Sequence, residues 1–323
     1  FTGVTADGSY TEAGFGHATS SDGVEWTMDP ANPVLTLGPD GDWDDEIVLG
    51  PAVVRDEAGF HMWYTGSGGT GQHVGYATSP DGTVWTKHGP VLESGPPGAW
   101  DHQIGPSAVV VVEGTYRMWF YGSDGSAYNG QIGYAESGDG ISWNKYPAPV
   151  LEPNRYPGSW EVQFLAPTVV FDGTTYHMWY GGNSQDWGKV GYAFSKNGIQ
   201  WTQHRDNPVH AFPGKNVVPV VAYDGSTFHM WYSRFGWPDT RATVAYATSD
   251  CCDGVADLSN MQTFPAAAVA SGSQGSFYQT DVDLNNSGDQ PVDYEFLWLP
   301  RGETNTEPVT SETFSLGVGM SVR

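Results

Sequence analysis

The stretch Ser137-Gly138-Asp139-Gly140-Ile141-Ser142-Trp143 decides the fold, because its pattern, Ser-x-[Asp/Asn]-Gly-x-x-Trp, occurs four times in the chain. The tryptophans of the four copies are Trp26, Trp85, Trp143 and Trp201, at intervals of 59, 58 and 58 residues. A second pattern, an aromatic residue followed by [His/Arg]-Met-Trp-[Tyr/Phe], occurs once per copy, with its tryptophans at 63, 119, 179 and 231. A fixed period of this length indicates stacked copies of one supersecondary unit.

Residues 106–145 show what one copy contains. An apolar, β-branched run at 106–112 is followed by an aromatic run at 115–122, and a third run at 131–137 leads into the hairpin turn Asp139-Gly140. These runs and the closing segment predict four short strands joined by turns. No stretch keeps a 3.6-residue periodicity, so helix should be scarce. Four-stranded repeats of this kind predict an all-β protein with a β-propeller fold.

The number of copies predicts five blades. Complete copies occupy about 48–87, 106–145 and 165–203, and residues 217–249 supply three strands of another. Phe1-Thr2-Gly3 matches Tyr64-Thr65-Gly66, so the chain begins inside a blade, and the first blade is incomplete. The expected propeller therefore covers residues 1–257.

The repeat stops after Asp257, and residues 258–323 are expected to form a short β appendage. Alternating strands are predicted at 277–284 and 292–299, with a polar turn between them. The pattern resembles the start of bacterial extracellular β-sandwich modules. Just before the appendage, the only two cysteines, Cys251 and Cys252, are neighbours, which leaves a vicinal disulfide, two free thiols or half a metal site open, with the metal site ranked last.

The composition of the chain limits the kinds of partner that the protein is expected to bind. The net charge is −24, with only 13 Lys and Arg residues, so binding to nucleic acid or to an anionic membrane is not expected. No apolar run approaches the roughly 18 residues of a membrane span. We expect a secreted propeller that works as a monomer and requires no cofactor, and whose fold is compatible with a structural Ca²⁺.

The candidate site lies in the connections that lead to the inner strands, because function concentrates on irregular loops. Three of these connections carry a tryptophan followed by an acid, and the fourth reads Gly214-Lys215-Asn216 instead. We expect the acids to converge at the mouth of the central channel. The candidate catalytic residues are Asp44, Asp45, Asp101 and Glu161. The candidate substrate-binding residues are Trp43, Trp100, His102, Gln103, Trp160, Gln163, Asn183, Asp186, Trp187, Arg234 and Trp237.

Converging carboxylates beside tryptophans suit sugar chemistry. Glycoside hydrolysis uses one carboxyl group as proton donor and a second as base or nucleophile, and a nearby third can shift the pKa of the donor. A structural role is the alternative for each acid, since Trp-[Asp/Glu] recurs wherever the blade recurs. His61, His177 and His229 occupy equivalent positions and are expected to pack and hydrogen-bond.

These motifs resemble the five-bladed propellers of glycoside hydrolase families 43 and 32 and their relatives, including the mannoside phosphorylases. The resemblance rests on the Ser-x-[Asp/Asn]-Gly-x-x-Trp boxes, on His-Met-Trp-Tyr-x-Gly at 61–66 and 177–182, and on Trp-[Asp/Glu]. It implies Asp44 or Asp45 as base, Asp101 as modulator of the donor's pKa and Glu161 as general acid, in a mechanism that is expected to invert the anomeric centre.

Two alternatives remain at this point. Sialidases carry similar boxes, but the boxes here are one residue shorter, and the few arginines are scattered. A non-catalytic glycan-binding or surface-adhesion propeller would keep the tryptophans without the carboxylate geometry. A carboxyl pair within reach across the channel mouth favours the enzyme, and scattered acids favour the binder.

Overall fold

The computed structural model describes most of the chain up to residue 250. The described residues are 2–3, 14–69, 71–126, 129–154, 159–183, 189–211, 218–235, 242–250 and, beyond these, seven short strands between 262 and 322. All their regular elements are strands, so the prediction of an all-β protein is confirmed within these ranges. The chain divides into two compact units, residues 1–268 and 269–323.

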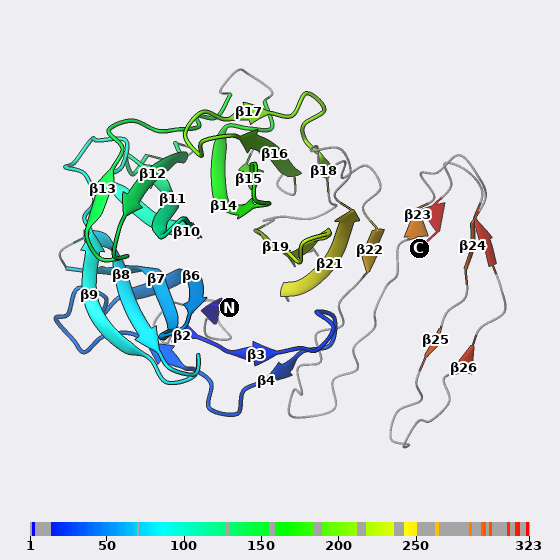
Figure 1. The fold of residues 1–323 in the computed structure, drawn as a ribbon, viewed down its shortest axis with the longest axis horizontal. Coiled ribbons are helices and arrows are strands. Elements are labelled where there is room, and N and C mark those ends of the chain that lie inside the picture. Colours follow the sequence, from blue (N-terminus) through cyan, green and yellow to red (C-terminus); the bar gives the residue numbers. More distant parts are fainter. Residues whose placement is uncertain are drawn as a thin grey trace. The chain divides into compact units, whose positions relative to one another are not determined.

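Four antiparallel sheets form the blades of a propeller, with β6, β10, β14 and β19 nearest the centre (Figure 1). Each blade is named here by its inner strand. The β6 blade contains β6 (Ile47–Asp56), β7 (Gly59–Gly68), β8 (Gly71–Ser79) and β9 (Thr86–Leu92). The β10 blade contains β10 (Gln103–Val112), β11 (Thr115–Ser123), β12 (Gln131–Ser137) and β13 (Trp143–Lys145).

The other two blades depart slightly from this plan. The β14 blade contains β14 (Gln163–Phe171), β15 (Tyr176–Asn183), β16 (Lys189–Ser195) and β17 (Thr202–Gln203), and β18 (His210–Ala211) also pairs with β16. The β19 blade contains β19 (Pro219–Tyr223), β20 (Thr227–Phe235), β21 (Ala242–Asp250) and β22 (Gln262–Phe264). The predicted propeller boundary after Asp257 falls before β22, which pairs with β21.

The N-terminal strands extend the ring. The strands β1 (Thr2–Gly3), β2 (Gly14–Phe15) and β5 (Leu35–Thr36) form one small sheet, and β3 (Ala18–Thr19) pairs with β4 (Thr27–Met28). The Nε1 group of Trp231, in the β19 blade, donates a hydrogen bond of 2.6 Å to the carbonyl oxygen of Gly23. The last complete sheet is thus joined to the N-terminal segment.

The repeated box explains how neighbouring blades are joined. Within one box, Ser137 and Asp139 accept hydrogen bonds from backbone amides of the turn, and Gly140 has a φ of 73°, which favours glycine. The carbonyl oxygen of Gly140 accepts from Trp143 Nε1 at 3.0 Å and from Trp63 Nε1, in the preceding blade, at 2.8 Å. The two patterns recur together because each provides one side of this joint.

The second unit, residues 269–323, has three two-stranded antiparallel pairs. They join β23 (Leu284–Asn285) to β28 (Ser321–Val322), β24 (Val292–Tyr294) to β27 (Phe314–Leu316), and β25 (Leu297–Trp298) to β26 (Val309–Thr310). The predicted strand at 292–299 corresponds to β24 and β25. Most of the predicted strand at 277–284, and both cysteines, lie outside the described residues.

Candidate functional site

Each recurring tryptophan lies over its own blade. An added Cβ at Gly122 would lie 2.6 Å from the Trp100 ring, and one at Gly133 would lie 2.7 Å from it, so Trp100 occupies space that side chains on β11 and β12 would fill. Trp43 lies in the same way over Gly66 and Gly75. Trp160 lies over Gly182 and stacks on Tyr180 with ring centroids 6.2 Å apart.

The β19 blade lacks both the glycine pair and the tryptophan, which indicates that the two features occur together. Its sequence aligns Arg234 with Gly122, and Ala245 with Gly133, while its connection has no tryptophan. A side chain larger than hydrogen would meet the indole ring at both positions in the β6 and β10 blades; in the β14 blade it would meet Trp160 at Gly182 and the Tyr180 ring at Gly191. The glycines are therefore present where a tryptophan must be accommodated.

The acid after each tryptophan is buried and bonded within its own blade. Asp44 Oδ2 accepts from Tyr64 at 2.9 Å and pairs with Lys87 Nζ at 2.7 Å. Asp101 Oδ2 pairs with Lys145 Nζ at 2.5 Å. Lys87 and Lys145 belong to the outermost strands, β9 and β13. We call each set, comprising tryptophan, acid and the partner on the outer strand, a clamp, because it fixes the connection to the end of the sheet.

The clamp of the β14 blade differs in its outer-strand residue. Gln203 replaces the lysine at the same register, since Lys87, Lys145 and Gln203 face Ala77, Ala135 and Ala193 of the adjacent strand. Gln203 Nε2 donates to Glu161 Oε1 at 3.1 Å and to Oε2 at 3.0 Å, and Tyr180 donates to Oε1 at 3.0 Å. Glu161 is 5% exposed, and no cation contacts it among the described residues.

A polar pocket of about 170 Å³ opens beside Glu161. Tyr180, which bonds Glu161, also accepts a hydrogen bond from Asn207 Nδ2 at 3.0 Å. The backbone amide of Asp206 donates to His204 Nδ1 at 3.3 Å. The lining residues are Asn154, Ser159, Trp160, Glu161, Gln203, His204 and Asn207. Glu161 is thus a predicted catalytic residue that lines a pocket.

The phenol groups that hold two of the acids stay protonated. Burial, and then the nearby Asp44 carboxylate, raise the pKa of Tyr64 far above its ordinary value. Burial and the Glu161 carboxylate do the same to the pKa of Tyr180. Both tyrosines therefore act as permanent hydrogen-bond donors to their acids at neutral pH.

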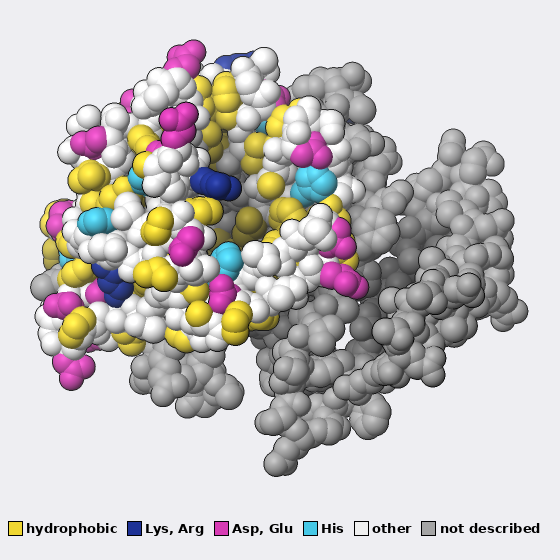
Figure 2. Space-filling model, turned by 60° about the horizontal axis from the view of Figure 1, so that its bottom comes forward, with side chains coloured by type: hydrophobic (Ala, Val, Ile, Leu, Met, Phe, Trp, Pro, Cys, Tyr) yellow, Lys and Arg dark blue, Asp and Glu magenta, His cyan; other side chains and the backbone are white. Residues whose placement is uncertain are grey.

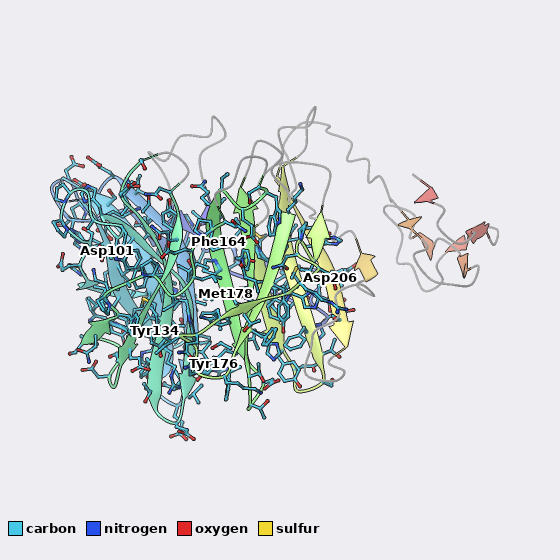
Figure 3. All side chains as sticks on the ribbon, turned by 90° about the horizontal axis from the view of Figure 1, so that it is seen from above. Asp101, Tyr134, Phe164, Tyr176, Met178 and Asp206 are labelled. Atoms are coloured by element: carbon cyan, nitrogen blue, oxygen red, sulfur yellow. The ribbon has the colours of Figure 1, made fainter. Side chains whose placement is uncertain are left out.

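The contacts of the predicted acids do not join one acid to another. Asp44, Asp101 and Glu161 each bond to partners in their own blade, and two of those partners are lysines of outer strands. Figure 3 shows Asp101 in the upper half of the sheets and Tyr176 in the lower half. This geometry gives the recurring acids a structural role, and their convergence at the channel mouth stays a prediction.

The remaining predicted residues near the connections are half-buried or exposed. Asp45 accepts a hydrogen bond of 2.6 Å from the amide of Gly41. His102 Nδ1 lies 3.3 Å from the carbonyl oxygen of Gly95. Gln103 and Gln163 begin the inner strands β10 and β14. None of these side chains contacts the Glu161 carboxylate among the described contacts.

The other predicted substrate-binding residues lie beyond what the structure describes. The backbones of Asn183 and Arg234 belong to β15 and β20, but their side chains are outside the description. Asp186, Trp187 and Trp237 are themselves outside the described residues.

Sequence reasoning missed the partners of the acids. Lys87, Lys145 and Gln203 each follow the box tryptophan by two residues. The strand that follows each box is the outermost strand of its blade. The regular position on this strand is the sequence signal that identifies the partners of the acids.

The predicted packing histidines form short polar chains. His177 is fully buried, with Nδ1 2.7 Å from Tyr192 Oη and Nε2 2.9 Å from Asp172 Oδ2. Burial lowers the pKa of His177, although Asp172 opposes this. In the β10 blade the equivalent residue is Arg117, whose Nε lies 3.6 Å from Glu136 Oε1. The histidines therefore pack and hydrogen-bond, as predicted.

The described part of the chain has no group of three or more His, Cys, Asp or Glu side chains arranged to hold a metal ion. Nor does that part contain a helix long and apolar enough to cross a membrane. The face in Figure 2 carries acidic side chains scattered over its surface and few basic ones, which agrees with the net charge of −24.

Comparison with known proteins supports the predicted resemblance. The model of the glycosyl hydrolases family 32 N-terminal domain matches residues 8–167. An uncharacterized protein of Mycobacterium tuberculosis is 28% identical over 179 residues, which cover 50% of this chain and 57% of that protein. The matched region thus spans little more than half of that relative.

Solved structures share the fold. A thermostable family-43 glycoside hydrolase aligns with a TM-score of 0.63 at 18% identity, covering 83% of this chain and 90% of its own. The β-1,2-mannobiose phosphorylase from Listeria innocua, in complex with β-1,2-mannobiose, aligns with a TM-score of 0.54 at 18% identity, covering 74% and 67%. In sequence over residues 8–167 and in fold, the chain therefore resembles the propeller glycoside hydrolases, as its repeats predicted.

Proposed function

We propose that this protein acts on carbohydrate as a propeller glycoside hydrolase. The observation that carries the proposal is the match of residues 8–167 to the family 32 N-terminal domain, on a chain that folds as a propeller. The substrate is a plant, algal or microbial oligosaccharide or polysaccharide. The protein is exported in this proposal, because such polymers lie outside the cell.

The proposed ring has five blades. The register of β1 and β2 pairs Thr2 with Phe15, as β7 and β8 pair Thr65 with Val74. The box of the N-terminal segment receives Trp231 of the β19 blade as the box of the β10 blade receives Trp63. Both observations support counting the N-terminal strands as a blade that closes the ring.

Glu161 is the proposed proton donor. It alone of the three clamp acids is held by neutral donors, and it lines a pocket. Asp44 and Asp101 are paired with lysines, which favours a role in fixing the connections over a role as base. The second carboxylate that a hydrolase requires is therefore sought outside these two residues.

A second function, glycan binding without hydrolysis, is favoured by one observation. The lining of the Glu161 pocket contributes a single carboxylate, together with amide groups and Trp160. Amides bond sugar hydroxyls, and an indole ring packs on a sugar face. A site of this composition can hold a glycan without supplying the two carboxyl groups of hydrolysis.

The test is a panel of aryl-glycosides and polysaccharides, scored for both cleavage and binding, with the parent protein and Glu161→Gln. If Glu161 is the proton donor, the variant should lose about 10²–10⁴-fold in rate and keep its melting temperature. Folding is expected to survive because the amide of Gln203 can flip to offer its oxygen to the new amide group.

The outcomes separate the two functions. Binding without cleavage by the parent protein supports the glycan-binding alternative. Full activity in Glu161→Gln assigns proton donation to another residue. Failure of every glycan to bind or be cleaved contradicts both proposed functions. Asp40→Asn, at an exposed acid outside the clamps, is the matched control.

A further inference from the structure

We propose that the pocket beside Glu161 binds the primary ammonium group of an amino sugar. This inference rests on the proposed carbohydrate function in its glycan-binding form, in which Glu161 acts as a carboxylate and not as a proton donor, and it specifies the ligand. In the β6 and β10 blades a lysine ammonium lies 2.7 Å from Asp44 and 2.5 Å from Asp101. The β14 blade keeps the tryptophan and a buried acid but has Gln203 in place of the lysine. Among the described residues no protein ammonium therefore occupies this position, and one from a ligand can take it.

The charge of the buried Glu161 carboxylate favours a cationic ligand. The Glu161 carboxylate is 5% exposed and is held by Gln203 and Tyr180, which are both neutral donors. A buried carboxylate without a cation is unfavourable, and a bound cation relieves this cost. The strongly acidic chain also raises the local concentration of cations.

His204 is the other titratable side chain in the lining of the pocket. The amide of Asp206 donates to His204 Nδ1 at 3.3 Å, and no contact between this ring and the Glu161 carboxylate occurs among the described residues. Arg205, the next residue, is highly exposed and pairs with Asp206. Among the described contacts, neither side chain pairs with the Glu161 carboxylate.

The acceptors and the volume of the pocket fit an ammonium group carried by a sugar. Oε1 of Glu161 accepts from Tyr180 and Gln203, whereas among the described residues Oε2 accepts from Gln203 alone, so Oε2 has capacity for a further donor. An ammonium has three donors and makes charge-assisted bonds. The pocket, at about 170 Å³, exceeds the space of one water molecule. Its amides and Trp160 suit the hydroxyls and ring of a sugar that carries the amino group.

The experiment measures binding of glucosamine tetramer, N-acetylglucosamine tetramer, cellotetraose and 1,4-diaminobutane by calorimetry, at physiological salt and at pH 6, where the glucosamine amino groups are mostly protonated. We expect glucosamine tetramer to bind about 10- to 100-fold more tightly than the two neutral tetramers, the range of a hydrogen bond to a charged group. Gln203→Lys should remove this preference, because its ammonium would pair with Glu161 as Lys145 pairs with Asp101.

The control variant is Gln200→Lys, which adds the same charge at an exposed position of the preceding turn and should keep the preference. Equal binding of the three tetramers, or an unchanged preference in Gln203→Lys, overturns the inference and leaves the proposed function standing. Tighter binding of the diamine than of glucosamine tetramer overturns the assignment to a sugar. If no glycan binds or is cleaved in any assay, the proposed function and the inference both fail.

Discussion

The β10 and β14 blades carry the same clamp with different outer-strand partners, and the β19 blade carries none. Where the tryptophan is present, β11 and β12 carry glycines beneath it, and where it is absent these positions hold Arg234 and Ala245. Where the acid pairs with Lys145 it is neutralised, and where it meets Gln203 a pocket opens. The comparison teaches that the recurring acid fixes the connection to its sheet, and that the change from lysine to Gln203 leaves Glu161 bonded to neutral donors only, among the described residues.

The largest expected effect comes from removing Lys145 from the clamp of the β10 blade. Lys145→Met leaves Asp101 buried without its cation, and we expect a loss of about 2–4 kcal/mol in the free energy of unfolding. Gln203→Met removes only a neutral donor from Glu161, with an expected loss of about 1 kcal/mol. Denaturant unfolding of both variants measures the difference. Equal losses would mean that the two clamps do not differ electrostatically.

The second expected effect concerns the glycine beneath the tryptophan. In Gly133→Ala the new Cβ would lie 2.2 Å from the Phe120 ring and 2.7 Å from the Trp100 ring. Such overpacking costs about 1–3 kcal/mol, which thermal or denaturant unfolding will register.

Gly138→Ala, in the adjoining turn, is the matched control. An added Cβ there meets no atom within 4 Å, and the change should stay within about 0.5 kcal/mol. A harmless Gly133→Ala would show that Trp100 can move away, and the clamp would then not be rigid.

The blades could be predicted from the sequence because each local signal repeats with a reason in the backbone. The Asp-Gly turns and the alternating strands recur every 58 residues, and the box tryptophans mark each outer strand. The direction of Asp44 and Asp101 could not be predicted in the same way. It depends on Lys87 and Lys145, which lie more than 40 residues further along the chain and meet the acids only when the blade closes.

The smallest expected effect compares the polar chains of the same two blades. Burial acts to raise the pKa of Asp172, but hydrogen bonds from His177 and from the amides of Thr174 and Thr175 hold it at about 2. A carboxyl group whose folded pKa lies below its unfolded value of 3.8 stabilises the fold above pH 4, and this contribution disappears as the pH falls toward 2. The β10 blade has Arg117 in place of the histidine.

Asp172→Asn should therefore lose about 1–2 kcal/mol at pH 7, and the gap from the parent protein should close between about pH 4 and pH 2. Melting temperatures recorded across this range provide the measurement. Asp40→Asn, at an exposed acid, should follow the parent curve throughout. A gap that does not change with pH would show that Asp172 contributes through its shape and turn hydrogen bonds alone, since only the charged form can lose its advantage on protonation.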